Sequence, residues 1–200
     1  MVTSYNIINI LKTVEKINSR SGNSASQKFI ATSQIYAKLT QGLSPKIRNI
    51  FERRFGVKNG NPETLESIGQ RLGITRERVR QIEGAGFAHV KKNHGVVLDA
   101  LFGELESYFN NRGGFKREEM ALAELGGQKN QPYVVFMLAI GGDRFSRVCG
   151  KRDYHYFWST APNGKTVKEN LASLVSDIKS HGKLLSKDEV LSLFGKKYAL

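Results

Sequence analysis

Apolar side chains at helical spacing organise the start of the chain. Residues 4–18 carry them on one face, with charged side chains opposite, which predicts an amphipathic helix. That face is suited either to dimerisation or to packing on the chain's own core. Residues 19–26 are mostly Ser, Asn and Gly, which predicts a linker, and a short helix is expected over residues 27–39. The apolar positions of the first helix are Ile7, Ile10, Leu11, Val14 and Ile17.

Two clear helix starts follow this N-terminal part. Ser44 is a favourable N-cap and Pro45 suits the first helical position, which predicts a helix that ends at Gly56. Residues 65–72 have the pattern of a short helix, and Thr75 suits the N-cap of a longer one. The predicted order is helix, loop, short helix, turn and long helix.

Within residues 43–93 the small and apolar residues have the spacing of a helix-turn-helix. This motif needs a small residue where its helices touch and a turn residue that tolerates positive φ. Gly69 and Gly73 meet these demands, and the apolar side chains of Val79 and Ile82 can pack the second helix against the first. We therefore expect a helix-turn-helix DNA-binding domain over residues 43–93.

The outer face of the second helix carries side chains that can read DNA bases. Arginine offers a bidentate fork to guanine, glutamine pairs with adenine, and glutamate accepts a hydrogen bond from cytosine. The predicted base-reading residues are Arg76, Glu77, Arg80 and Gln81. The residues expected to hold phosphates are Thr75, Arg78, Lys91 and Lys92.

Beyond Asn93 the pattern predicts three helices and a hairpin. The helices are expected over residues 96–111, 117–125 and 132–140, and the strands over residues 145–148 and 154–158. Three helices followed by a two-stranded wing predict a winged-helix-like α+β unit over residues 95–160. It loosely resembles the small winged-helix modules of the RNA polymerase delta subunit and of some restriction and chromatin proteins.

Part of this unit recurs near the C-terminus. Seven residues match seven others at a constant separation of 69 positions. The second copy, residues 165–200, stops before a third helix and hairpin, so we expect either a helical hairpin at the chain end or, as we favour, a sequence trimmed from a longer chain. The pairs are Leu105 and Leu174, Phe109 and Ile178, Gly113 and Gly182, Phe115 and Leu184, Leu122 and Leu191, Leu125 and Phe194, and Gly126 and Gly195. The predicted fold class is mainly α.

The net positive charge of the chain indicates a polyanionic partner. The chain has 200 residues, 31 Lys and Arg against 18 Asp and Glu, and a net charge of +13. The excess is densest over residues 43–94, which hold 11 basic and 5 acidic residues, and such an imbalance favours polyanions through counterion release. No run has the roughly 18 apolar residues of a membrane span, and the N-terminus does not resemble a signal peptide. We expect a cytoplasmic, nucleoid-associated protein with double-stranded DNA as its partner.

The proposed wing also carries basic and aromatic residues. Its cations, which can hold phosphates or simply face solvent, are Arg144, Arg147, Lys151 and Arg152. Its aromatic residues, Tyr154, Tyr156, Phe157 and Trp158, are expected to be strand core rather than a base-stacking platform, because no RNA-binding sheet is predicted around them.

One segment resembles a known family. Four quoted stretches are similar to region 4 of sigma-70-type factors: Leu43-Ser44-Pro45, Arg53-Arg54-Phe55-Gly56, Thr64-Leu65-Glu66-Ser67-Ile68-Gly69 and Gly73-Ile74-Thr75-Arg76-Glu77-Arg78-Val79-Arg80-Gln81-Ile82-Glu83. The resemblance implies binding to the upstream (minus 35) promoter element and docking on the flap of the RNA polymerase β subunit. It also implies base contacts by the four residues named above.

The sequence departs from this family in two places. Gly84-Ala85-Gly86 replaces stronger helix formers, so we expect the far end of the reading helix to be weak or bent. The 42 residues before Leu43 are too short for the family's promoter-melting module and hold only Tyr5, Phe29 and Tyr36 as aromatics. The chain alone is not expected to melt promoters.

Signals for catalysis are absent from the sequence. His89, His94, His155 and His181 are scattered, Cys149 is the only cysteine, and no phosphate loop or nucleophile motif occurs, so we expect no enzyme, no metal and no cofactor. The leading hypothesis is a sequence-specific transcription protein. The alternatives are an interaction protein that docks on RNA polymerase, or the DNA-binding arm of a larger nuclease whose catalytic part lies beyond Leu200.

Overall fold

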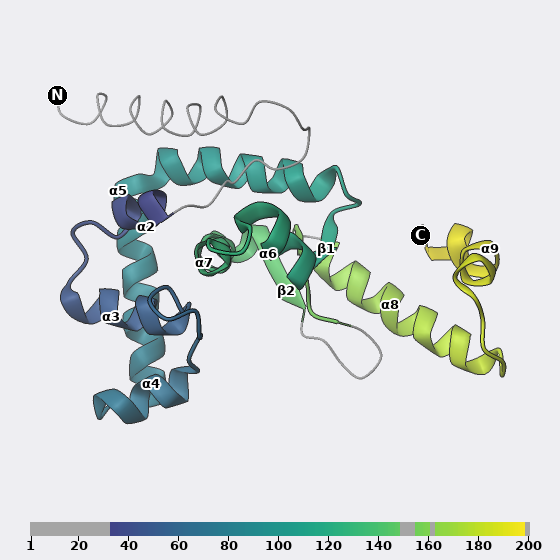
Figure 1. Ribbon diagram of the computed structural model, residues 1–200, viewed down its shortest axis with the longest axis horizontal. Helices are drawn as coiled ribbons and strands as arrows, with labels where there is room; N and C mark the ends of the chain where they lie inside the picture. Colours follow the sequence, from purple (N-terminus) through teal and green to yellow (C-terminus); the bar gives the residue numbers. More distant parts are fainter. Residues whose placement is uncertain (1–32, 149–154, 161–162, 199–200) are drawn as a thin grey trace.

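A computed structural model describes residues 33–148, 155–160 and 163–198 (Figure 1). The amphipathic helix and linker expected in residues 4–26 lie outside the described residues, as do Cys149, Lys151, Arg152 and Tyr154. The described elements are α2 (Ser33–Leu39), α3 (Pro45–Arg54), α4 (Leu65–Leu72), α5 (Arg76–Asn110), β1 (Phe115–Arg117), α6 (Glu118–Gly126), α7 (Gln131–Gly141), the 3-10 turn η1 (Gly142–Arg144), β2 (Phe145–Val148), β3 (Phe157–Thr160), α8 (Asn163–Ser180) and α9 (Lys187–Tyr198). The fold is mainly helical with one small antiparallel sheet, as predicted at that level.

The helix ends of the first part form where the sequence predicted them. The Ser44 hydroxyl accepts the backbone N–H of Ile47 at 3.4 Å, with Pro45 as the first residue of α3. The Thr75 hydroxyl caps α5 by accepting the N–H of Arg78 at 3.1 Å. Gly73 ends α4 with φ +65°, a conformation that favours glycine. Local hydrogen bonding therefore sets these boundaries.

Helix α5 consists of two helical segments joined at a kink. The longer helix expected after Thr75 and the helix expected over residues 96–111 meet at His94, whose dihedral angles are non-helical (φ −130°, ψ 23°), so the break lies where the sequence predicted it. Figure 1 shows α5 changing direction along its length. Of the weak or bent helix expected after Glu83, the bend is not found at Gly84 or Gly86, because the non-helical angles inside α5 are those of His94.

Gly86 is required by packing. A Cβ atom there would lie 2.6 Å from Ile47 Cγ2 and 2.7 Å from Phe51 Cζ, so the missing side chain lets α3 approach α5 closely. Gly84 has nothing within 4 Å of the equivalent position. Both glycines lower the helix propensity of α5, but only Gly86 is needed for packing.

We expect alanine to have opposite effects at these two positions. Gly84→Ala should raise the free energy of unfolding by about 1 kcal/mol, since it only restores helix propensity. Gly86→Ala should lower it by about 1–2 kcal/mol, because overpacking against the buried Phe51 ring outweighs that gain. Urea unfolding followed by circular dichroism measures both, and equal stabilisation by the two variants would contradict the packing argument.

The sheet lies in the second part of the chain and is larger than the predicted hairpin. Its order is β1-β3-β2, all antiparallel, with Phe115 opposite Ser159 and Phe145 opposite Thr160. Strand β1 was missed, since residues 113–117 were interpreted as a break followed by a helix. Strand β3 begins at Phe157 rather than Tyr154.

The aromatic side chains of the hairpin divide between core and surface. Phe157 and Trp158 are buried, which confirms that prediction. Tyr156 is 46% exposed, with the Arg147 guanidinium 4.6 Å from its ring centroid, so its expected place in the core is wrong.

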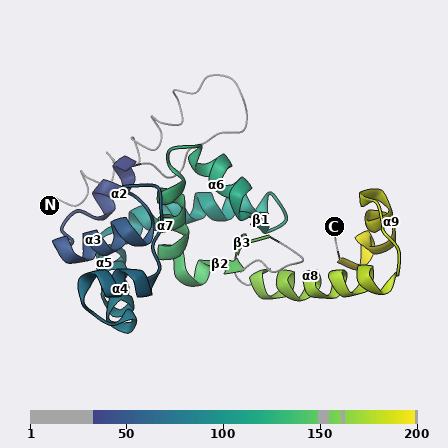
Figure 2. The ribbon, with the colours of Figure 1, turned by 60° about the horizontal axis from the view of Figure 1, so that its bottom comes forward.

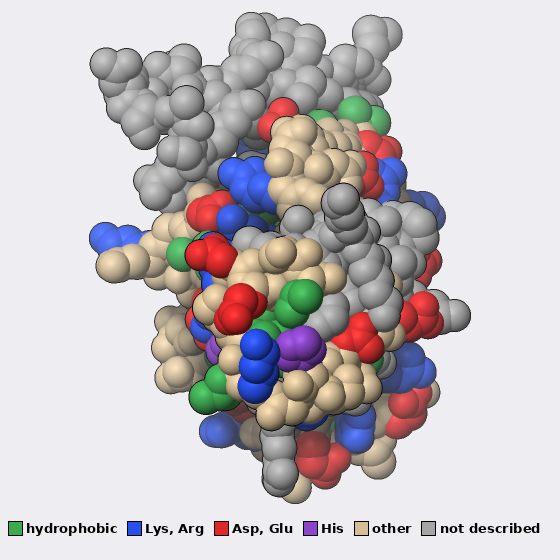
Figure 3. Space-filling view, turned by 90° about the vertical axis from the view of Figure 1, so that its right-hand side faces the viewer, with side chains coloured by type: hydrophobic (Ala, Val, Ile, Leu, Met, Phe, Trp, Pro, Cys, Tyr) green, Lys and Arg blue, Asp and Glu red, His purple; other side chains and the backbone are tan. Residues whose placement is uncertain are grey.

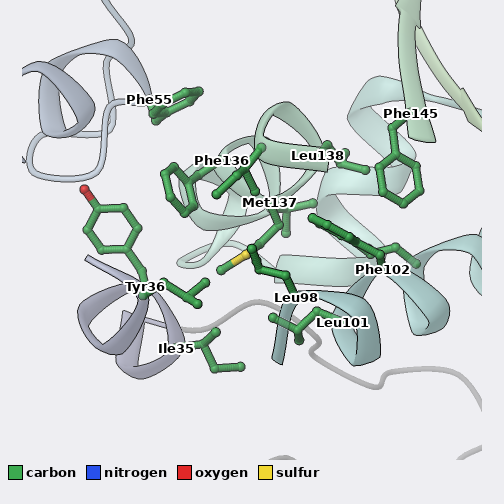
Figure 4. Close-up of a cluster of buried hydrophobic side chains, with 14 of the residues drawn as sticks. Ile35, Tyr36, Phe55, Leu98, Leu101, Phe102, Phe136, Met137, Leu138 and Phe145 are labelled. Atoms are coloured by element: carbon green, nitrogen blue, oxygen red, sulfur yellow. The ribbon is translucent and has the colours of Figure 1, made fainter. Parts of the chain in front are cut away.

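One hydrophobic core joins the helix-turn-helix side to the sheet side (Figure 4). Phe136 of α7 is fully buried and lies at its centre. Its ring centroid is 4.9 Å from that of Tyr36, 5.4 Å from those of Phe51 and Phe55, and 6.0 Å from that of Phe87. Helix α7 is thus held between α2, α3 and α5. Residues 43–93 therefore pack directly on residues 95–160, which are called the second unit below.

Helices α8 and α9 correspond to the predicted second copy. Figures 1 and 2 show α8 leaving the sheet with α9 at its far end. Gly182 follows α8 with φ +73°, as Gly113 follows α5 with φ +79°. Leu184, which matches Phe115 of β1, is fully exposed. The side chains of Leu191 and Phe194 lie outside the described residues. No helix among those described is long and apolar enough to span a membrane.

Candidate nucleic-acid interface

The helix-turn-helix is held by a small core of its own. Ile50, Ile68 and Val79 are fully buried, and Leu65, Leu72, Ile74 and Ile82 pack around them. Gly69 allows the two helices to meet, because a Cβ atom there would lie 2.7 Å from the backbone oxygen of Ile74. Val79 and Ile82 therefore turn one face of α5 inward and leave the opposite face to solvent.

The four predicted base readers lie together on that outer face. Arg76, Glu77, Arg80 and Gln81 are all exposed in the first two turns of α5. Arg80 donates two hydrogen bonds to Glu77, Nε to Oε2 at 2.8 Å and Nη2 to Oε1 at 2.7 Å. Gln81 Nε2 donates to Glu77 Oε1 at 3.4 Å, so three of the four form one hydrogen-bonded group.

Glu77 is the acceptor at the centre of this group. Its hydrogen bond from Arg80 lowers the pKa of the Glu77 carboxyl below its usual value, which keeps it ionised. The same bond raises the pKa of Arg80. The Glu77 carboxylate restricts the orientation of the planar Arg80 guanidinium. This restriction lowers the conformational entropy that the guanidinium would lose on pairing with a base.

The residues predicted to contact phosphates have different surroundings. Thr75 accepts the N–H of Arg78, yet its hydroxyl proton remains available to a phosphate. Arg78 is exposed and donates to Gln81 Oε1 at 3.2 Å. Lys91 and Lys92 are both exposed, and Lys91 Nζ lies beside the end of α7, 3.4 Å from where a Cβ on Gly142 would be.

Comparison with known proteins identifies this segment. Residues 41–92 match the family model described as sigma-70, region 4. These residues form a sigma-70 region 4 domain. No solved structure matches the chain.

The relatives of the region 4 domain are much longer proteins. The chain is 43% identical over 59 residues to the RNA polymerase principal sigma factor HrdC of Streptomyces coelicolor, covering 28% of this chain and 17% of that protein. It is 48% identical over 62 residues to the RNA polymerase sigma factor SigA of a Nostoc species, covering 30% and 16%. It is 39% identical over 54 residues to the RNA polymerase sigma factor sigB of Arabidopsis thaliana, covering 27% and 9%. The chain thus spans less than a fifth of the length of these relatives.

An ion-pair cluster that the sequence analysis missed braces the region 4 domain. Glu63 lies 3.0 Å from Arg53 Nη1 and 3.4 Å from Arg71 Nε, which ties the loop before α4 to α3 and to the end of α4. Hydrogen bonding to Arg53 and the nearby Arg71 charge lower the pKa of Glu63 against the desolvation that raises it. Glu83 of α5 pairs with Arg54 at 3.4 Å. The sequence offered no signal for these pairs beyond the charges themselves.

The wing cations that the structure describes are engaged with carboxylates. Arg144 lies 2.9 Å from Asp99 and 3.7 Å from Glu106. Arg147 donates to Glu118, with Nη2 to Oε1 at 2.7 Å. Figure 3 shows the face at the α8–α9 end, where basic and acidic side chains are intermixed. The other two predicted wing cations, Lys151 and Arg152, lie outside the described residues.

Helix α7 does not present a second reading face. Val134, Phe136, Met137, Leu138 and Ile140 are fully buried, because α7 packs between the sheet and the region 4 domain. Among the described residues, no group of three His, Cys, Asp or Glu side chains could hold a metal ion. Helix α7 therefore offers no exposed polar face comparable with that at the start of α5.

Proposed function

We propose that this chain binds duplex DNA of the promoter type through its region 4 domain, in the manner of a transcription protein. The observation that carries the proposal is the exposed group of Arg76, Glu77, Arg80 and Gln81 at the capped N-terminus of α5. An α-helix fits the major groove, and these side chains match the donor and acceptor patterns of guanine, cytosine and adenine. The three relatives named above are RNA polymerase sigma factors, which supports the same assignment.

Phosphate contacts in this proposal come from Thr75, Arg78, Lys91 and Lys92. They position α5 over the groove without reading sequence. Lys91 is the least favourably placed of the four, because its ammonium also lies beside Gly142.

We propose that the second unit, residues 95–160, is a winged-helix-like domain that supports region 4 rather than reading DNA itself. The later part of α5, then β1, α6, α7, β2 and β3, follow the helix, strand, helix, helix, hairpin order of such units. The helix that would be its reader, α7, is buried. Arg144 and Arg147 would reach phosphates only by exchanging their present carboxylate partners.

Selection from a randomised duplex pool tests the main proposal. The purified chain should enrich one sequence motif, and its affinity should fall steeply between a low and a higher salt concentration. Enrichment of a single motif supports base reading by α5. Equal recovery of all sequences would show that charge alone holds the DNA.

A second candidate function is docking on RNA polymerase. It is favoured by the sigma-factor names of the relatives and by the family resemblance, which implies the β-subunit flap as partner. A pull-down of a purified β-flap fragment by the chain in the absence of DNA tests it. Retention that survives Arg80→Ala would support docking independent of base reading, and no retention would remove this candidate.

A further inference from the structure

Arg80, one of the four proposed base readers, lies between two carboxylates of its own helix. Glu77 precedes it by three positions and Glu83 follows it by three, and residues at this spacing are neighbours on a helix surface. Both carboxyl groups act electrostatically on the Arg80 guanidinium. The sequence therefore offers Arg80 two acceptors.

The structure pairs Arg80 with Glu77. The Arg80 Nε and Nη2 atoms donate to the two carboxylate oxygens of Glu77 at 2.8 and 2.7 Å. The Glu77 side chain is 56% exposed, so this pairing holds the guanidinium on the outer face of α5. A base edge in the major groove can reach the guanidinium there.

Glu83 is turned toward α3 instead. Its side chain is 15% exposed, and its Oε1 atom lies 3.4 Å from Nε of Arg54, the last residue of α3. Burial raises the pKa of the Glu83 carboxyl, whereas the positive charges of Arg54 and Arg80 act to lower it. Among the described residues, these two arginines are the cations that act on Glu83.

The Arg54 side chain is held beside Glu83 by the segment that leads into α4. Its Nη1 atom donates a hydrogen bond to the backbone oxygen of Glu63 at 3.1 Å. The backbone N–H of Glu63 in turn donates to the backbone oxygen of Arg53 at 2.9 Å. Arg54 can therefore neutralise Glu83 without help from Arg80.

Loss of Arg54 would change the balance between the two carboxylates. Glu83 would become a largely buried charge whose nearest remaining cation on α5 is Arg80. A buried charge without a partner is costly, so Glu83 would compete with Glu77 for the Arg80 guanidinium. A guanidinium drawn to Glu83 would lie toward α3 and away from the outer face of α5.

We propose that Arg54 is a positioning residue for DNA reading. By pairing with Glu83, it prevents Glu83 from competing for Arg80 and leaves Arg80 with Glu77 on the outer face of α5. This inference rests on the base reading by α5 proposed above. It gives α3, which carries none of the proposed base readers, a part in sequence discrimination.

The test measures a discrimination ratio. This is the affinity of the full chain for its selected duplex, divided by its affinity for a duplex changed at the base pair that Arg80→Ala no longer distinguishes. Arg54→Gln should lower the ratio at least about fivefold. Glu83→Gln should keep it, and Arg54→Gln combined with Glu83→Gln should restore it to within about twofold, because the competing carboxylate is gone. Binding is measured at about pH 8, where a carboxyl with a raised pKa is still ionised.

Other roles of Arg54 predict different results. If Arg54 held a phosphate, Arg54→Gln would weaken binding to all duplexes equally and the ratio would not change. If the ion pair only stabilised the fold, both single variants would act alike and the double variant would be no better than Arg54→Gln. The matched control is Arg112→Gln in the second unit, which should leave the ratio unchanged. Arg112 also lies 3.4 Å from a glutamate, Glu124, and its side chain is 34% exposed, against 37% for Arg54.

Gly84 allows a second test that does not depend on the folding of Arg54→Gln. It follows Arg80 by four positions, and nothing lies within 4 Å of a Cβ atom placed there. Gly84→Glu adds a competing carboxylate and should lower the ratio about twofold, since an exposed pair at this spacing is weak. Gly84→Gln should leave the ratio unchanged. Circular dichroism checks the folding of each variant.

A measurement without DNA separates this inference from the proposed function. In heteronuclear NMR spectra, the Arg80 Nε–H resonance is assigned by its loss in Arg80→Ala. It should shift in Arg54→Gln and return in the double variant.

The proposal is overturned if folded Arg54→Gln keeps the wild-type ratio, or if the double variant is not restored. If Arg54→Gln does not fold, an unchanged ratio in Gly84→Glu overturns it. If the wild type itself does not discriminate between duplexes, the proposed base reading is wrong, and the NMR result alone decides whether Arg54 positions Arg80.

Discussion

Arg80→Ala is expected to lower the affinity of the chain for its selected duplex by about 1–3 kcal/mol, which is roughly 5- to 150-fold. The loss should be confined to duplexes that carry the base pair Arg80 reads. Arg80 is exposed near the start of α5, and its fork is held by Glu77 at 2.7–2.8 Å. Competition between the selected duplex and single-base variants measures the effect.

Arg78→Ala is the matched control for that experiment. Arg78 is also an exposed arginine of α5, two positions away, and its predicted partner is a phosphate. Its loss should weaken binding to all duplexes about equally and reduce the salt-dependence slope by about 1. If Arg80→Ala instead weakens all duplexes equally, direct readout by Arg80 is wrong. Docking on RNA polymerase then becomes the better explanation of the region 4 domain.

Phe136→Ala is expected to lower the free energy of unfolding by about 3–5 kcal/mol, because it empties a fully buried site at the centre of the shared core. Its ring contacts aromatic side chains of α2, α3 and α5. Urea unfolding is followed by Trp158 fluorescence, which reports on the sheet, and by circular dichroism, which reports mainly on the helices. Both midpoints should coincide in the wild type and fall together in the variant.

Phe115→Ala is the control for Phe136→Ala. Phe115 is 38% exposed in the edge strand β1, and its ring pairs with Phe157 at 6.0 Å, so its loss should cost less than about 1.5 kcal/mol. If Phe136→Ala moves only the fluorescence midpoint, the region 4 domain unfolds independently. The continuous core would then contribute little to its stability.

The shared core has a consequence for how DNA binding is organised. Helix α5 carries the proposed base-reading residues at its start and belongs to the second unit at its end, after the bend at His94. The second unit is therefore connected to the start of α5 in two ways, through the length of α5 itself and through the packing of α7 on α3 and α5. Helix α7 packs on apolar side chains of α3 and α5, and the face of α5 with Arg76, Glu77, Arg80 and Gln81 is exposed.

Features set by neighbouring residues were determined by the sequence alone. The caps at Ser44 and Thr75, the left-handed turn at Gly73 and the span of α4 depend on hydrogen bonds and dihedral angles within a few residues. The exposure of the four proposed base readers followed from the helical period once Val79 and Ile82 were assigned to the inner face. The resemblance to region 4 rested on the same local stretch.

Features that depend on distant partners were decided only by the tertiary structure. Strand β1 has three residues and forms because β3, about 40 positions later, supplies its hydrogen-bond partners. Gly86 weakens a helix in isolation, yet here it is the point at which α3 packs on α5. The partners of Arg144 and Glu63 likewise come from other elements or turns. A one-dimensional pattern shows that a side chain is apolar or charged, whereas the tertiary packing decides which side chain it meets.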